Sequence, residues 1–124
     1  MKLEFDNRQT IEMLKQNLIR GAILREPIYV TEKHRGCGKT TALIDFAKEF
    51  DFTVIVNEHL VKMIKQDFNY HKITSFDHFN HTTRHLIGHP KNEKFVHDEG
   101  ISTDKINQLK NMYNLDIITG FSRR

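Results

Sequence analysis

The sequence predicts a three-layer α/β fold in which one mostly parallel sheet of about five strands is covered by helices on both faces. From Pro27 onward, segments with strand character alternate with segments of helical periodicity, as in parallel strands joined by right-handed crossovers. A glycine-containing stretch, HRGCGKTTAL (34–43), separates the first strand from the next helix. We expect a single small domain over the 124 residues, with a helical segment at 1–26 before an alternating core at 27–124.

Helical segments are indicated by apolar residues that recur every three or four positions. The first runs from residue 7 to about residue 25 and is ended by Pro27, because the residue before a proline disfavours helical geometry. Ser102 is a suitable cap for the last one. The remaining expected helices are 39–50, 59–68, 76–88 and 103–113.

Strand segments are short and rich in β-branched and aromatic residues. They are PIYVTE (27–32), FTVIVNE (52–58), KITSF (72–76), EKFVHDEG (93–100) and LDIITGF (115–121). We expect the first strand, 28–31, at or near an edge of the sheet. Because exposed edges invite unwanted pairing, the N-terminal segment or a neighbouring subunit should cover it.

The glycine stretch has the chemistry of a phosphate-binding loop. A helix start offers free backbone N–H groups and partial positive charge. Gly36 and Gly38 let the backbone approach a ligand, Lys39 can reach the β- and γ-phosphates, and Thr40 can hold Mg²⁺. The residues expected to line the nucleotide are Lys33, His34, Arg35, Gly36, Cys37, Gly38, Lys39, Thr40 and Thr41. Lys33 stands where the pattern G-x-x-x-x-G-K-[ST] has its first glycine.

Two acidic residues follow the strand FVH and supply what a hydrolytic site needs. Asp98 could hold Mg²⁺ together with Thr40, and Glu99 could orient or deprotonate the attacking water. His97 interrupts the apolar run of that strand. Thr119 is expected to end a strand inserted between the loop strand and the Asp98 strand, where it would face the γ-phosphate; a simple Thr-Gly turn is the alternative.

Taken together, these residues resemble the P-loop NTPases, and most of all the first motor domain of superfamily 2 helicases and the ATPase domain of phage terminase large subunits. RGCGKTTAL (35–43) is similar to the terminase phosphate loop, which implies that Arg35 acts as an arginine finger within the subunit. VIVNEHLVKMI (54–64) and ITSFDHF (73–79) resemble the helicase segments after the second and third strands. NRQTIEML resembles the adenine-reading region, which would assign that role to Gln9.

The resemblance implies ATP and Mg²⁺ as ligands and Mg²⁺-dependent ATP hydrolysis as the activity. Nucleic acid would be the partner, in a phage-like motor, packaging or replication assembly located in the cytoplasm, or in the host cytoplasm for a phage protein. The alternative is a catalytically weakened binding module that acts through a protein partner or a second copy. A nucleotide kinase ranks last, because no arginine between Gly100 and Thr119 could serve a lid.

Three further patterns carry weaker expectations. The histidines at 78, 81, 85 and 89 lie on one face of the expected helix, and we interpret them as a polar face rather than a zinc site. Cys37, beside a helix start, is expected to fill a variable loop position. Arg123 and Arg124 are interpreted as a frayed basic tail, with contact to a neighbour's phosphate or to nucleic acid as the alternative.

Composition limits the class of protein. The net charge of +3 allows nucleic-acid or nucleotide ligands without arguing for them, and a single cysteine excludes an intrachain disulfide and suits a reducing cytosol. No apolar run approaches the roughly 20 residues of a membrane-spanning helix, so no membrane partner is expected.

Overall fold

A five-stranded parallel sheet forms the centre of the computed structural model, which describes residues 2–30, 38–80 and 93–123. Its strands run in the order β1-β5-β4-β2-β3, and all four pairings are parallel. In chain order the strands are β1 (Ile28–Val30), β2 (Thr53–Val56), β3 (Ile73–Ser75), β4 (Lys94–His97) and β5 (Asp116–Arg123). The expected class, a mostly parallel sheet of about five strands between helices, is confirmed.

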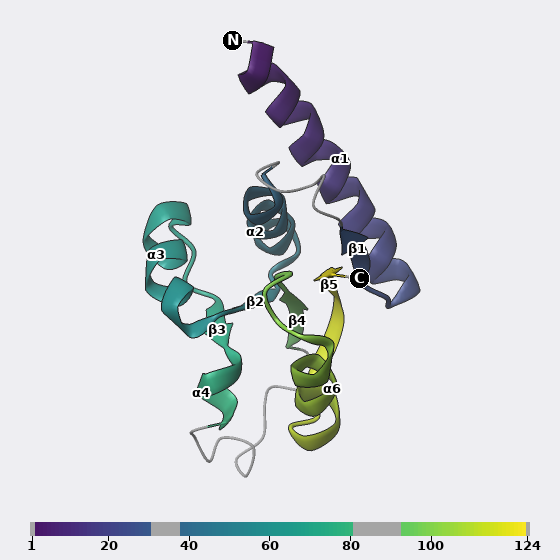
Figure 1. Cartoon of the computed structure of the whole chain (residues 1–124), viewed down its shortest axis with the longest axis vertical. Coiled ribbons are helices and arrows are strands. Elements are labelled where there is room, and N and C mark those ends of the chain that lie inside the picture. Colours follow the sequence, from purple (N-terminus) through teal and green to yellow (C-terminus); the bar gives the residue numbers. More distant parts are fainter. Residues whose placement is uncertain (1, 31–37, 81–92, 124) are drawn as a thin grey trace.

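Helices cover both faces of this sheet (Figure 1). The described helices are α1 (Lys2–Leu24), α2 (Lys39–Phe50), α3 (Glu58–Phe68), α4 (Phe76–Asn80) and α6 (Thr103–Met112). Three of them, α1, α2 and α3, pack on one face, whereas α4 and α6 pack on the other. The expected helix 76–88 is described only as far as Asn80, and its remainder lies outside the described residues.

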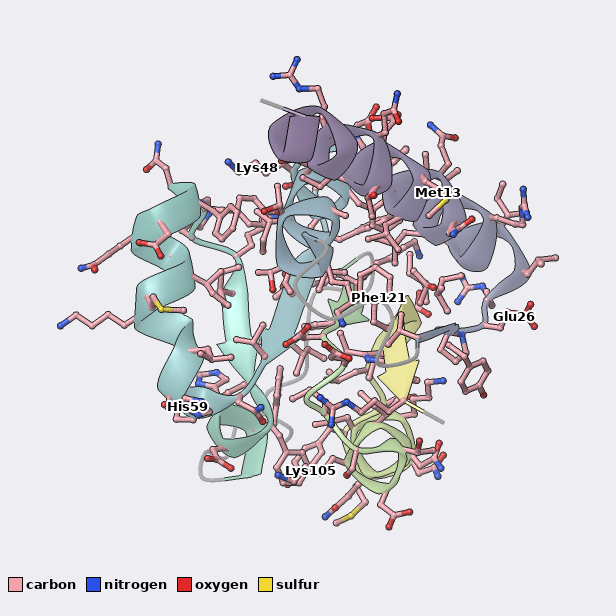
Figure 2. All side chains as sticks on the ribbon, turned by 45° about the horizontal axis from the view of Figure 1, so that its top comes forward. Met13, Glu26, Lys48, His59, Lys105 and Phe121 are labelled. Carbon is pink, nitrogen blue, oxygen red and sulfur yellow. The ribbon has the colours of Figure 1, made fainter. Side chains whose placement is uncertain are left out.

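Strand β2 shows why the sheet is buried on both sides. Its residues Thr53–Val56 are all buried, and the apolar side chains alternate between faces: Val54 and Val56 enter the core under α1, α2 and α3, whereas Ile55 enters the core under α4 and α6. A continuous apolar run is the expected sequence for a strand covered on two sides. Phe121 of β5 is fully buried in the first of these cores, and Figure 2 shows it inside the molecule, with His59 and Lys105 at the periphery.

Strand β5 lies between β1 and β4, as the sequence predicted, but it is longer than expected. It pairs with β4 up to Gly120 and then with β1, where Phe121 to Arg123 face Ile28 to Val30. The prediction that Thr119 ends the strand is therefore wrong. Arg123 is the last strand residue and not part of a frayed tail, because β1 supplies the hydrogen-bonding partner that keeps the chain extended.

The N-terminal helix lies beside the edge strand β1. Helix α1 packs against β1, β5 and α2. Gly21 is the point of closest approach: a Cβ at this position would lie 2.5 Å from Thr119 Oγ1 and 2.9 Å from the Glu26 carbonyl oxygen. Helix α1 thus covers one face of β1, and the protection of its free edge by the N-terminal segment or a neighbouring subunit stays a prediction.

Candidate functional site

The carboxyl end of the sheet brings together two segments that are far apart in the sequence. Helix α2 begins at Lys39 directly after the glycine stretch, and β4 ends at His97 just before Asp98 and Glu99. Lys39 Nζ lies 2.8 Å from Glu99 Oε1 in an ion pair whose side chains are only 8% and 18% exposed. Parallel strands place the loops that follow them at one edge, which is where ligands bind in open α/β sheets.

The start of α2 has the local geometry that an anion needs. Gly38 precedes the helix with φ 78° and ψ 27°, a left-handed conformation that favours glycine, and it has no side chain with which to cap the helix. The first turn contains no acidic residue. Ile11 of α1 lies directly against Gly38, since an added Cβ would be 2.5 Å from Ile11 Cγ1. Side-chain packing and backbone conformation therefore both require glycine here.

Glu99 is held by two cations, one on each side-chain oxygen. Lys39 contacts Oε1, and Arg123 Nε lies 3.5 Å from Oε2. Burial acts to raise the pKa of Glu99, but the hydrogen bond and charge of Lys39, with a smaller contribution from Arg123, outweigh it and hold the pKa below its usual range. Glu99 is therefore ionised at neutral pH.

Asp98 differs from its neighbour because burial dominates its environment. Desolvation raises the pKa of Asp98, while the backbone N–H groups of Glu99 and Gly100 and the charge of Lys39 offset part of that effect. Among the described residues, Asp98 makes no ion pair. A desolvated carboxylate that pairs with no cation in residues 2–30, 38–80 and 93–123 is a chemically suitable ligand for Mg²⁺, which prefers oxygen donors. Thr40, in the first turn of α2, is partly exposed.

His97, the last residue of β4, is a structural residue whose side chain packs on β5. Its ring packs on Gly120 of β5, where an added Cβ would lie 2.6 Å from the ring carbons and 2.4 Å from the His97 carbonyl oxygen. Nδ1 lies 3.2 Å from the Asp98 carbonyl oxygen. Burial lowers the pKa of His97 to about 4, so the ring is neutral at pH 7. The polar residue in the apolar run is thus a buried, hydrogen-bonded side chain.

Thr119 does not reach this site in the way the sequence suggested. Its buried hydroxyl donates a 2.8 Å hydrogen bond to the Glu26 carbonyl oxygen, just before β1, and the side chain faces Gly21 of α1. The cause is an irregularity in β5: Phe95 and Val96 pair with Ile117 and Thr119, so one extra residue is inserted. The strand then continues for four more residues and ends at Arg123.

The other residues expected in the site are exposed, partly exposed or outside the described residues. Gln9 is exposed on α1, two residues before Ile11, and residues two apart on a helix point to roughly opposite faces. Thr41 is partly exposed beside Thr40. The loop positions Lys33, His34, Arg35, Gly36 and Cys37 lie outside the described residues, as do His81, His85, His89 and Arg124. Within residues 2–30, 38–80 and 93–123, no group of three or more His, Cys, Asp or Glu side chains could hold a metal.

Two residues near the site were not assigned to it by the sequence analysis. Arg123 contacts Glu99, and the predicted strand ended at Phe121, two residues before it. Asn57 follows β2 at the N-cap of α3 but makes no capping hydrogen bond; its amide group lies against Gly100, where an added Cβ would be 2.5 Å from Nδ2. An asparagine directly after a buried strand was the corresponding signal.

Comparisons with known proteins leave the chain without an assigned family. No family model matches it, and no curated protein or solved structure gives a significant match. None of the helices in the described parts of the chain is both long and apolar enough to cross a membrane.

Proposed function

We propose that this protein binds and hydrolyses a nucleoside triphosphate, with ATP as the nucleotide, at the carboxyl end of its parallel sheet. The observation that carries the proposal is the buried ion pair between Lys39, at the start of α2, and Glu99, after β4. The order of strands supports it, because β5 separates β1 from β4, as expected for the strand that carries Thr119. A site of this kind requires a lysine and a carboxylate from these two places.

Each residue has a role that follows from its chemistry. The Lys39 ammonium group would neutralise phosphate charge, and the uncapped start of α2 would offer backbone N–H groups. Asp98 and Thr40 are the residues that would hold Mg²⁺, which supplies charge neutralisation on the phosphates. Glu99 would orient and deprotonate the water, a task for an ionised carboxylate. Arg35 and the other loop residues keep the roles that the resemblance implies.

The ion pair also defines the resting state of the site. A buried ammonium group needs an opposite charge nearby, and Glu99 provides it when no phosphate is bound. A triphosphate offers Lys39 a stronger partner, because phosphate oxygens carry more negative charge than one carboxylate. Nucleotide binding would then release Glu99 from Lys39 and make the carboxylate available to water.

Steady-state phosphate release with Mg-ATP tests the proposal. Lys39→Ala should weaken nucleotide binding, and Glu99→Gln should retain binding but lower turnover by about 100-fold or more, the usual contribution of a general base. Lys48→Ala is a matched control, since Lys48 lies at the other end of α2, where it donates to the Phe68 carbonyl oxygen. Equal turnover in the wild type and both site variants would rule out hydrolysis here.

A second candidate is the binding module that has lost turnover. It is favoured by Lys33 at the glycine position of the loop pattern and by the occupation of Glu99 by two cations. Calorimetry with Mg-ATP together with the phosphate-release assay separates the two: binding without release supports the module.

Coupling to nucleic acid rests on the resemblance alone and remains part of the proposal. If it holds, single-stranded or double-stranded DNA should raise the rate of ATP hydrolysis. The same oligonucleotides should leave the Glu99→Gln variant inactive.

A further inference from the structure

We infer that Arg123 is the positioning residue for Glu99, which it retains when Lys39 turns to a bound phosphate. This inference rests on the proposed function of the same site. Arg123 is the last residue of β5, and its Nε lies 3.5 Å from Glu99 Oε2, while Lys39 Nζ occupies Oε1. The carboxylate therefore has one cation on each oxygen, and these cations come from different elements.

The two cations differ in how freely they can move. Lys39 is only 8% exposed and begins the helix that would bind phosphate, so a nucleotide recruits it away from Glu99. Arg123 is 73% exposed and belongs to a strand that is paired with β1 at Val30. Its backbone is fixed by the sheet, which keeps the Arg123 side chain within reach of Glu99 when Lys39 leaves.

A hollow beside Glu99 makes this contact relevant to the reaction. It has a volume of about 390 Å³ and is lined by Glu99, Gly100, Ile101, Ser102, Thr103 and Arg123. Water can reach the carboxylate from this hollow, on the side of Arg123. A largely buried carboxylate that loses both cations would turn toward solvent, and Arg123 prevents this by holding Oε2. Arg123 contacts Glu99, and with residues 38–40, the described end of the glycine stretch, it forms no ion pair.

Kinetics of Arg123→Ala and Arg123→Lys test the inference, with Arg25→Ala as the control. Arg25 also contacts a carboxylate, that of Asp116, and lies outside the site. We expect Arg123→Ala to lower kcat about tenfold with little change in KM, because a displaced base loses orientation. Arg123→Lys should recover most of kcat, and Arg25→Ala should leave both constants unchanged. A raised KM with unchanged kcat would overturn the inference, since Arg123 would then bind nucleotide.

A second measurement does not depend on turnover. Arg123→Ala should lower the urea midpoint of unfolding more in a Lys39→Ala background than in the wild type, and not at all in Glu99→Gln. The same shift in all three backgrounds would overturn the inference. Absence of hydrolysis in the wild type would instead rule out the proposed function and, with it, the role of Arg123 in the reaction. The urea midpoints of unfolding would still report the contact between Arg123 and Glu99.

Discussion

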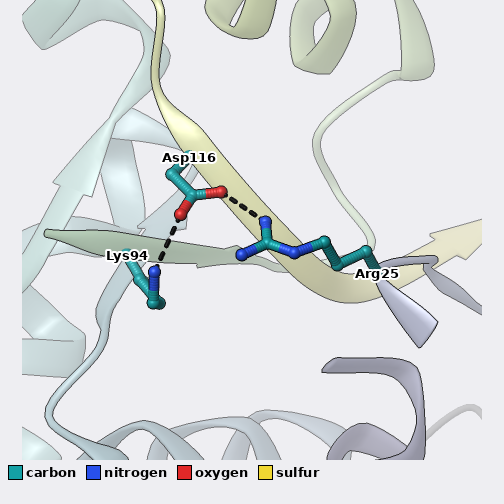
Figure 3. Close-up of polar contacts among 3 residues, drawn as sticks. All are labelled: Arg25, Lys94 and Asp116. Carbon is teal, nitrogen blue, oxygen red and sulfur yellow. Dashed lines mark hydrogen bonds and ion pairs between the residues drawn. The ribbon is translucent and has the colours of Figure 1, made fainter. Parts of the chain in front are cut away.

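The two ends of the parallel sheet each place one carboxylate between two cations, with different consequences. At the amino end, Asp116 accepts from Arg25 at 2.7 Å and from Lys94 at 3.0 Å (Figure 3). At the carboxyl end, Glu99 lies between Lys39 and Arg123. The charges match, and one cation at each end is exposed: Arg25 at 58% and Arg123 at 73%. The difference lies in the other groups, because Asp116 is 35% exposed, whereas Glu99 is 18% and Lys39 8% exposed.

Burial is what separates a surface ion pair from a candidate site. Water screens the charges around Asp116 and supplies alternative partners, so that cluster fastens the starts of β4 and β5 and little more. Lys39 is buried, has lost most of its water and depends on Glu99 for compensation. A ligand that offers phosphate oxygens can therefore compete strongly at the carboxyl end.

The largest expected effect comes from the same carboxylate-to-amide change at both ends. Glu99→Gln should lower the free energy of unfolding by about 2 kcal/mol, because it leaves the buried Lys39 ammonium without its counter-charge. Asp116→Asn should cost only about 0.5 kcal/mol, as for exposed pairs. Urea unfolding at low salt measures both. Equal costs would remove the distinction between the two ends.

A substitution of Thr119 tests whether its hydroxyl stabilises the fold or acts in the candidate site at the carboxyl end of the sheet. Thr119→Val removes the buried hydrogen bond to the Glu26 carbonyl oxygen while keeping the side-chain shape, and it should cost about 1 kcal/mol of stability. Hydrolysis of ATP should stay at the wild-type rate, because the hydroxyl faces α1. Loss of turnover at unchanged stability would instead return Thr119 to the phosphate site.

The pH dependence of stability tests the ion pairs of Asp116 at the amino end of the sheet. The hydrogen bond from Arg25, together with Lys94, holds the pKa of Asp116 below its usual range. A carboxyl group with a lowered folded-state pKa stabilises the fold above its unfolded value, about 3.9, and loses that contribution as the pH falls toward the folded value. The stability difference between wild type and Asp116→Asn should therefore be constant at neutral pH and shrink below about pH 4. A difference that grows on acidification would contradict the assignment.

Salt should produce the smallest effect. At about 1 M NaCl the Debye length falls to about 3 Å, so the cost of Asp116→Asn should nearly vanish. The cost of Glu99→Gln should persist in larger part, because Lys39 is only 8% exposed and a buried charge is screened less than an exposed one. Paired urea titrations at low and high salt provide the measurement, and a parallel loss at both ends would show that the carboxyl end is also open to solvent.

Much of the fold follows from local patterns in the sequence. The helix at 39–50 has the predicted bounds, and Ser102 caps α6 by accepting from the Lys105 N–H group. These features depend on propensity, periodicity and capping within a few residues, and these are encoded where they occur. The place of β5 between β1 and β4 was also predicted, from the alternating α/β topology as a whole.

The sequence by itself determined the α/β class, the identity of the strands, and the expectation that Lys39, Asp98 and Glu99 share one edge of the sheet. Only the tertiary structure decided that Lys39 pairs with Glu99, that Thr119 turns to Glu26, and that Arg123 completes the cluster. The irregularity in β5 and its pairing with β1 beyond Gly120 set the positions of Thr119 and Arg123, and the parallel arrangement of the strands brings Lys39 to Glu99. These contacts depend on pairing between distant strands, and one inserted residue redirects every side chain after it.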